Sequence, residues 1–292
     1  MKSKSSTNTS HIGRGLTLLT LSAALFALMG VLIRLASHSV DNATIVFFRN
    51  FTGLLLLLPF VLMKGPTFLK TEKLWMHSWR AFVGLIAMYG FFYAIAHLKL
   101  SNAMVFTYSS PIFIPLVAWL FLKERMTSLM WLAALVGLAG VILVAKPEQG
   151  FFNVLSVIGI VSSFLAAMAF VTVRALTATE PVTRIVFYFC LIGTLFSSLP
   201  MFWHWRAYTP QELALLMGAG LLATTSQLCL SKAYSYAPAG KIGPANYLAI
   251  IFAGIFAALI WHEYPDQMSI FGMILILVAL VLCMPRSPKI SA

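Results

Sequence analysis

The stretch that decides the fold is SNAMVFTYSSPIFIPLVAWLFLKER, residues 101–125. No residue from Ala103 to Leu122 is charged, and the run can cross a bilayer core as a helix, which takes about 20 residues. Consecutive hydroxyl side chains precede Pro111, and Pro115 follows. Proline removes a backbone hydrogen bond, which a membrane tolerates only where protein or water surrounds the backbone. The helix is therefore kinked either beside a substrate path or for packing, with its hydroxyls bonded to the backbone.

The composition of the chain is that of an integral membrane protein. Of the 292 residues, 60% are hydrophobic and only 10% are charged, and the mean hydropathy is +0.91. A soluble domain has about 25% charged residues, so this sequence cannot build a water-facing surface. Continuous apolar runs, rather than alternating polar and apolar residues, predict helical spans and not barrel strands.

Ten apolar segments can be placed along the chain, and they predict an all-α membrane protein with ten transmembrane helices. The segments are residues 15–36, 43–63, 79–98, 102–122, 127–145, 154–175, 184–202, 211–231, 241–261 and 268–284. Thr209 and Glu212 form a capping box at one helix start, and Asp266 is placed to cap the last segment. Gly243 and Pro244 should break or delay the helix of the ninth segment.

The Lys and Arg residues lie mostly in the connections, where they indicate topology. If the N-terminus is inside, fifteen of them, Arg80 included, fall on the inner side and three on the outer side. We therefore expect a multi-pass protein of the cell inner membrane with both termini cytoplasmic. These topology signals explain the net charge of +12, which therefore does not indicate nucleic-acid binding.

The two halves of the chain resemble each other. A shift of 139 residues gives seven identities over 31 positions, and it aligns Glu124 with Glu263. Each Glu closes an apolar segment, and Glu is rare in this sequence. Because each half holds five segments, an odd number, the second half must enter the bilayer from the opposite side. We expect residues 1–148 and 149–292 to form inverted five-helix repeats, as in many secondary transporters.

A family resemblance rests on two stretches. SSPIFIPLVAWLFLKERMT at 109–127 and YAPAGKIGPANYLAIIFAGIFAALIWHEYPD at 236–266 resemble the EamA-type transporters of the drug/metabolite transporter superfamily. The resemblance covers nearly the whole chain and implies a transport function without naming a substrate. The second half also resembles the subgroup that takes up S-adenosylmethionine. His262 stands where Gly is common in the family.

Arg49 is the charged residue that lies well inside a predicted span. Burying an Arg costs at least about 2.5–3.5 kcal/mol on insertion scales, so it should face the bundle interior or water. It pairs with an anionic group of the substrate, or it extends to the outer interface or neutralises the carbonyl groups at a helix C-terminus. No Asp or Glu lies deep in any span, so a carboxylate proton relay is not supported.

Other polar side chains within the spans complete the candidate site. Tyr89, Tyr93 and His97 share one helix face by their spacing, which fits either a cavity wall or packing. Gln227, Ser231 and Tyr234 form a similar face in the eighth segment. The predicted substrate-binding residues are Arg49, Tyr89, Tyr93, His97, Tyr108, Ser109, Gln227, Ser231, Tyr234, Asn246 and Tyr247.

The sequence also argues against several functions. It contains neither a nucleotide-binding loop of the Walker type nor a cluster of carboxylates or His at membrane depth, so we expect no enzyme activity, no cofactor and no metal. The three cysteines lie in apolar runs without metal-ligand or redox spacing. The expected partners are a small-molecule substrate, the lipid bilayer and, as one possibility, a second copy in a homodimer.

These observations predict a secondary transporter that moves a small polar metabolite across the inner membrane by alternating access. A guanidinium can hold a carboxylate bidentately, whereas a cationic drug would find no buried counter-ion. We therefore expect an amino-acid-like substrate that is carboxylate-bearing or zwitterionic. Two alternatives stay open: an S-adenosylmethionine uptake transporter, and a non-transporting membrane scaffold or lipid-handling protein.

Overall fold

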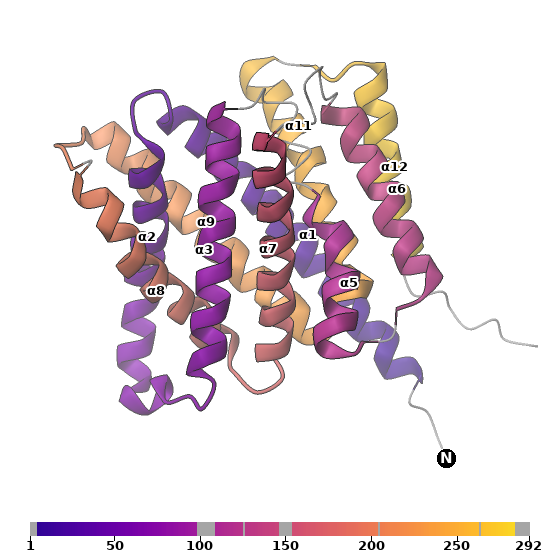
Figure 1. Cartoon of the computed structure of the whole chain (residues 1–292), viewed down its shortest axis with the longest axis horizontal. Helices are drawn as coiled ribbons and strands as arrows, with labels where there is room; N and C mark the ends of the chain where they lie inside the picture. The colour runs from indigo at the N-terminus through magenta and orange to yellow at the C-terminus, as the bar shows by residue number, and fades with distance from the viewer. Residues whose placement is uncertain are drawn as a thin grey trace, which may run out of the picture.

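The computed structural model describes residues 5–97, 109–124, 126–145, 154–203, 205–262 and 264–283, and these ranges are helical without a strand. The all-α prediction is confirmed. The helices, labelled as in Figure 1, are α1 (Ser5–Ala36), α2 (Asn42–Lys64), η1 (Pro66–Leu69), α3 (Leu74–His97), α5 (Ser110–Leu122), α6 (Ser128–Ala145), α7 (Val154–Leu176), α8 (Val182–Trp203), α9 (Pro210–Tyr236), α10 (Ala239–Ile242), η2 (Gly243–Tyr247), α11 (Leu248–Trp261) and α12 (Gln267–Cys283).

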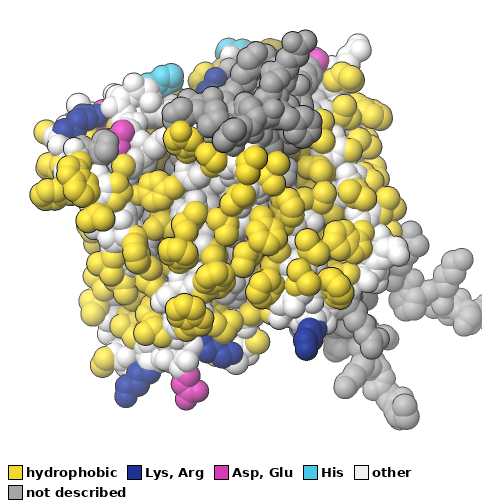
Figure 2. All heavy atoms as spheres, viewed as in Figure 1, with side chains coloured by type: hydrophobic (Ala, Val, Ile, Leu, Met, Phe, Trp, Pro, Cys, Tyr) yellow, Lys and Arg dark blue, Asp and Glu magenta, His cyan; other side chains and the backbone are white. Residues whose placement is uncertain are grey.

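Hydrophobic side chains cover the middle of the molecule. Six helical segments of the described chain are long and apolar enough to cross a membrane, and α5, α6 and α12 are shorter apolar helices. Figure 2 shows hydrophobic side chains across the middle of one face, with charged side chains near its upper and lower edges. Exposed apolar area on this scale needs a lipid solvent. The protein is a multi-pass membrane protein.

Several helices begin with the predicted capping residues. Thr209 and Glu212 form the capping box of α9, in which each side chain accepts a hydrogen bond from the other residue's backbone N–H. Asp266 accepts from the backbone N–H of Ser269 at the start of α12. These caps satisfy donors that a helix start otherwise leaves unpaired, and both capping predictions are confirmed.

The fourth helix of each half ends in the same way. α5 begins at Ser110, with Pro111 in its first turn, and residues 101–108 of the quoted stretch lie outside the described residues. At its end Lys123 takes the left-handed conformation, and its N–H donates to the Ala118 carbonyl. In α11 His262 takes the same conformation and donates to the carbonyl of Ala257. Both pairs are 139 residues apart in sequence.

The ninth predicted span is a broken helix. The short α10 is followed by the 3-10 turn η2, and the regular α11 begins only at Leu248. Pro244 stands in the first turn of η2, where its missing N–H costs no helix hydrogen bond. The prediction that Gly243 and Pro244 interrupt this helix is confirmed.

Helices of the two halves pack against each other in matched pairs. α1 packs against α9 and α3 against α7, while α2 packs against α8 and α6 against α12. Figure 1 shows α2 and α8 at one side of the molecule and α6 beside α12 at the other. α7 and α9 are the first and third long helices of the second half, as α1 and α3 are of the first. Each half therefore contributes the same helices to the contact with the other.

Two glycines bring α2 and α8 into close contact. A Cβ at Gly193 of α8 would lie 2.8 Å from the Asn50 amide oxygen, and a Cβ at Gly53 of α2 would lie 2.7 Å from the Cys190 sulfur. Both distances are too short for a side chain. Small residues of this kind allow membrane helices to approach closely, and here they join the two halves.

Polar clusters join the halves at both ends of α2. The Arg206 cluster consists of Ser39, Arg206, Thr209 and Glu212. The Arg206 guanidinium donates to the Ser39 carbonyl at 2.8 Å and pairs with the Glu212 carboxylate at 2.6 Å. Thus the α1–α2 connection is bonded to the α8–α9 connection.

The Glu180 cluster lies at the other end of α2 and consists of Phe68, Thr71, Glu180 and Arg184. The Glu180 carboxylate accepts from the Thr71 hydroxyl and from the Arg184 guanidinium, both at 2.6 Å. Arg184 also donates to the Phe68 carbonyl at 2.6 Å. The α7–α8 connection is therefore bonded to the α2–α3 connection, which is the reciprocal pairing of the halves.

Candidate substrate site

Arg49 lies inside the helix bundle. It stands on α2 and is 8% exposed, so its guanidinium does not extend to the interface. The guanidinium donates to the Met88 sulfur at 3.3 Å, and its central carbon lies 5.7 Å from the centre of the Phe189 ring. A thioether is a weak acceptor and an aromatic ring carries no net charge, so neither contact neutralises the arginine.

A second arginine, Arg80, shares the Phe189 ring. The central carbon of its guanidinium lies 3.5 Å from the ring centre, and the Gln227 side-chain oxygen accepts from it at 2.7 Å. Arg80 is 3% exposed. The sequence analysis counted Arg80 among the charges of the inner side. Because α3 begins at Leu74, five residues before the predicted segment, Arg80 lies within this helix and its side chain is buried in the bundle.

A sequence signal for Arg80 was present in the helix periodicity. Positions 77, 80, 84 and 87 fall on one face of a helix, and they hold His77, Arg80, Gly84 and Ala87. Small residues at that spacing mark a face that packs closely on other helices. An arginine on such a face is directed into the bundle, whichever end of the helix lies near.

The two arginines have no carboxylate partner within the described chain. The Nε and Nη1 atoms of Arg80 are buried without a hydrogen-bond acceptor, and no ion pair of Arg49 or Arg80 with a described residue is found. Removing charge from water without compensation is costly. Ionisable groups in this situation inside membrane proteins mark substrate or ion sites.

Further polar atoms near these helices also lack partners. The Asn50 side-chain oxygen and the Thr52 hydroxyl of α2, the Tyr89 hydroxyl of α3 and the Ser231 hydroxyl of α9 are buried without a hydrogen bond within the described chain. Buried polar groups are nearly always hydrogen-bonded to protein or to water. These atoms therefore provide hydrogen-bonding capacity for a polar ligand or for ordered water.

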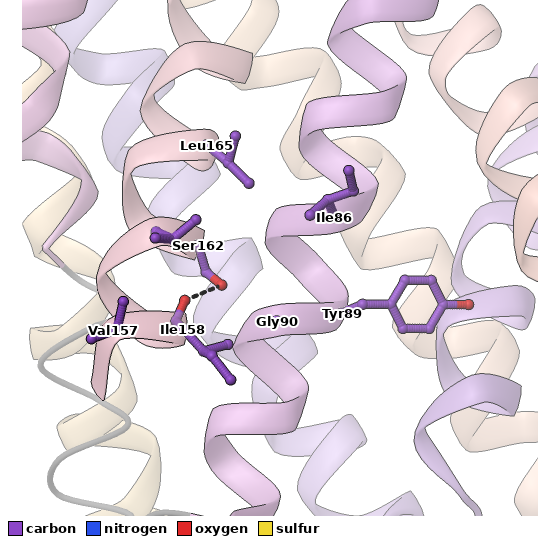
Figure 3. Close-up of a pocket in the computed structure, with 8 residues that line it drawn as sticks. Ile86, Tyr89, Gly90, Val157, Ile158, Ser162 and Leu165 are labelled. Atoms are coloured by element: carbon purple, nitrogen blue, oxygen red, sulfur yellow. Dashed lines mark hydrogen bonds between the residues drawn. The ribbon is translucent and has the colours of Figure 1, made fainter. Parts of the chain in front are cut away.

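The predicted residues of the first half separate into several environments. Tyr89 directs its ring away from α7, as Figure 3 shows, whereas Tyr93 is 43% exposed. Ser109 is buried directly before α5. Tyr108 and the side chain of His97 lie outside the described residues. Of this group, Arg49 is the residue that the structure joins to Arg80 through a common ring.

The predicted residues of the second half form two groups. Gln227 bonds Arg80, one turn of α9 before the buried Ser231. Tyr234 accepts from the Asn246 amide at 3.1 Å, and the Tyr247 hydroxyl donates to the Ala134 carbonyl at 3.0 Å. Tyr234 and Tyr247 are fully buried and already have partners in the protein, so packing accounts for both.

An apolar cavity of about 340 Å³ lies between α3 and α7 (Figure 3). The hydroxyl of Ser162, which lines this cavity, donates to the Ile158 carbonyl at 2.7 Å, as the dashed line in Figure 3 marks. The lining residues are Ile86, Tyr89, Gly90, Val157, Ile158, Val161, Ser162 and Leu165. None of them is charged, and Ile86, Val157 and Val161 are exposed on the molecular surface. This chemistry fits a lipid chain and not a charged metabolite.

Comparison with known proteins identifies the chain. The profile of the EamA-like transporter family matches residues 13–146 and, a second time, residues 154–284. The chain belongs to this family. The predicted boundary between 148 and 149 falls in the interval between the two matches.

Two curated relatives of this EamA-like protein cover most of its length. The pseudopaline exporter CntI of Pseudomonas aeruginosa is 33% identical over 270 residues, which are 91% of this chain and 94% of the relative. The S-adenosylmethionine uptake transporter of Rickettsia bellii is 28% identical over 272 residues, 93% and 92% of the two chains. Both relatives are transporters, and the membrane transporter class of this chain is thereby shown.

A solved crystal structure has the same fold. It superimposes on this EamA-like protein with a TM-score of 0.78 at 16% sequence identity, and the match covers 92% of this chain and 95% of the other. At this identity the likeness concerns the arrangement of the helices alone.

Proposed function

We propose that the protein is a secondary transporter that moves a small carboxylate-bearing or zwitterionic metabolite across the inner membrane by alternating access. In this proposal ten transmembrane helices form two inverted repeats, residues 1–148 and 149–292, and both termini are cytoplasmic. The predicted site residues other than Tyr234 and Tyr247, which packing explains, serve in it as first candidates for the substrate path. The family and the transporter names of both relatives support the class.

The observation that carries the substrate chemistry is Arg49. It is buried in α2 and has no carboxylate partner among the described residues, so an anionic group of the substrate would supply the missing charge. A planar guanidinium binds a carboxylate through two parallel hydrogen bonds. A scaffold protein would gain nothing from an uncompensated arginine at this depth.

Alternating access is supported by the two polar clusters. The Arg206 cluster and the Glu180 cluster join the halves at opposite ends of α2. A protein that opens to one side at a time must break one such set of contacts while it keeps the other. Hydrogen bonds to ionised groups are strong enough to hold a closed end and specific enough to re-form.

The test combines substrate discovery with variants of Arg49. Metabolites inside and outside cells with and without the gene identify the transported molecule and its direction, and proteoliposomes then measure its flux. Arg49→Ala should abolish the flux nearly completely, and Arg49→Lys should reduce it clearly because Lys keeps the charge but loses the fork. Arg34→Ala is the matched control, since Arg34 is exposed and lies over Trp261. Normal flux in Arg49→Ala at normal insertion would refute the proposal.

S-adenosylmethionine uptake is the second candidate, because the relative of that name matches over more than nine tenths of both chains. The methionine part of that molecule has a carboxylate for Arg49. Its sulfonium adds a positive charge, and the described helix interior offers it no carboxylate. Uptake of labelled S-adenosylmethionine by proteoliposomes decides this directly: saturable uptake would establish it, and its absence would leave the first candidate.

A further inference from the structure

We propose, on the basis of the proposed function, that the substrate carries two carboxylates and that Arg80 binds the second while Arg49 binds the first. Both guanidiniums stack on one ring, at 5.7 and 3.5 Å from the centre of Phe189. The distance between the two guanidinium carbons cannot exceed the sum of these values. A small molecule with two carboxylates a few bonds apart spans such a distance.

The interior arginines differ from those at the helix ends. Arg174 pairs with Glu124, Arg184 with Glu180 and Arg206 with Glu212. Each of these three lies near the end of a helix and has a carboxylate within 3.3 Å. Arg49 and Arg80 are buried inside the bundle, and neither has a carboxylate partner among the described residues. Two guanidiniums therefore lack an anionic partner among the described residues, and we infer that each binds a carboxylate of the substrate.

Arg80 keeps free donors in its present position. Gln227 accepts from Nη2, while Nε and Nη1 are buried without an acceptor. The hydrogen bond that Arg80 donates to Gln227 therefore positions the guanidinium without satisfying its other donors. A carboxylate that accepts from the remaining donors would form charge-assisted hydrogen bonds, which are about twice as strong as neutral ones. Phe189 holds both guanidiniums by cation–π contacts and contributes no competing negative charge.

The experiment measures ligand binding by the full chain in lipid nanodiscs, as the shift of its thermal unfolding midpoint. The probes are succinate and its monoamide succinamate, which have nearly the same shape and differ by one carboxylate, and inorganic phosphate. We expect succinate to act at concentrations at least tenfold lower than succinamate. In Arg80→Gln, succinate should need the same concentrations as succinamate to shift the unfolding midpoint. Binding of succinamate, which depends on Arg49, should change little.

Two further variants separate binding from folding. Arg80→Lys keeps the second charge and should retain a preference for succinate, even if the variant is less stable without ligand. Arg34→Gln removes an exposed arginine and should leave the preference unchanged. An Arg80→Gln protein that keeps the full preference for succinate would overturn the inference, because the second carboxylate would then bind elsewhere.

The outcomes distinguish this inference from the proposed function. If succinate and succinamate bind equally well and Arg49→Gln loses both, the inference of a second carboxylate is overturned. The proposal of a carboxylate-bearing substrate then still stands. Failure of both acids to bind would count against both proposals. Phosphate binding that is tighter than succinate binding and depends on both arginines would also overturn the two-carboxylate class, since one compact anion would then bridge Arg49 and Arg80.

Discussion

The Arg206 cluster and the Glu180 cluster occupy corresponding places in the two halves but differ in burial. In the Arg206 cluster the Arg206 side chain is 43% exposed and its carboxylate partner belongs to a capping box. In the Glu180 cluster the Glu180 side chain is 5% exposed, and Nε2 of the buried His77 lies 3.9 Å from its carboxylate. The fold places the same connections against each other at both ends, while the side chains set how strongly each end is held.

Because of this difference in burial, the end of the bundle at the Arg206 cluster and the end at the Glu180 cluster need not open with equal ease. An exposed ion pair contributes little, because water and salt screen it and the side chains lose entropy. A buried carboxylate with two donors loses much more when either donor leaves. We therefore expect the end at Glu180 to be the firmer of the two in this conformation.

Cross-links across the two clusters should have the largest effect. Cysteine pairs replace Ser39 and Arg206 in one variant and Thr71 and Glu180 in another, in a chain without its three native cysteines. A short thiol cross-linker should abolish flux in both variants, and a reducing agent should restore it, because each link prevents one end from opening. Flux that survives complete cross-linking of either pair would show that the cluster is not part of the moving boundary.

Loss of the Glu180 carboxylate should have the next largest effect, and this one concerns stability. Breaking a buried ion pair costs about 3–5 kcal/mol. Glutamine can still accept from Thr71, so we expect Glu180→Gln to lose about 2 kcal/mol. Glu212→Gln is the matched change in the other cluster, and its loss should be smaller. Thermal or denaturant unfolding in detergent measures both, and equal losses would contradict the ranking.

Acid should weaken the Glu180 cluster before the rest of the fold. Burial alone would raise the pKa of Glu180, but hydrogen bonds from Thr71 and Arg184 outweigh burial, so this pKa lies below its ordinary value of 4.5. A lowered pKa stabilises the fold fully above pH 4.5, and the contribution is lost as the pH falls through the folded-state value. The stability difference between the wild type and Glu180→Gln should therefore be constant from pH 7 to about 5 and shrink below. A difference that grows in acid would refute this.

Salt should produce the smallest effect, and mainly in the Arg206 cluster. The hydrogen bond with Glu212 raises the pKa of Arg206 further, so this side chain stays charged and only screening can weaken the pair. Raising the ionic strength to 1 M shortens the screening length to about 3 Å. The destabilisation by Arg206→Gln should become smaller at high salt, while that of Glu180→Gln should hardly change.

Hydropathy predicted where the helices lie but not how far they extend. α2 and α8 begin and end within two residues of the predicted segments, whereas α1 starts at Ser5 and α3 at Leu74, well before residues 15 and 79. Hydropathy marks the part of a helix that lipid surrounds. Backbone hydrogen bonding continues through the polar residues beyond, so the earlier starts carry no apolar signal.

The sequence indicated a buried position for both arginines, through the apolar run around Arg49 and the small-residue face around Arg80, but it did not indicate the partners of Arg80. Arg49 interrupts an apolar run, and that alone placed it inside the bundle. Arg80 lies at the edge of a segment, and its environment depends on Phe189 and Gln227, which are more than 100 positions away in sequence. Only the packing of α8 and α9 on α3 brings these residues together, and a local pattern does not contain that information.

The close contacts at Gly53 and Gly193 have a consequence for how the protein is made. α2 leaves the ribosome before any of α8 and α9 has been synthesised, yet Gly53 faces Cys190 and Thr224, and Asn50 faces Gly193. The first half therefore enters the bilayer with its closest-fitting surface still covered by lipid, and it cannot complete its packing until translation of α9 is finished. Premature termination would leave a nascent chain with buried polar groups facing lipid, a target for the proteases that survey membrane insertion.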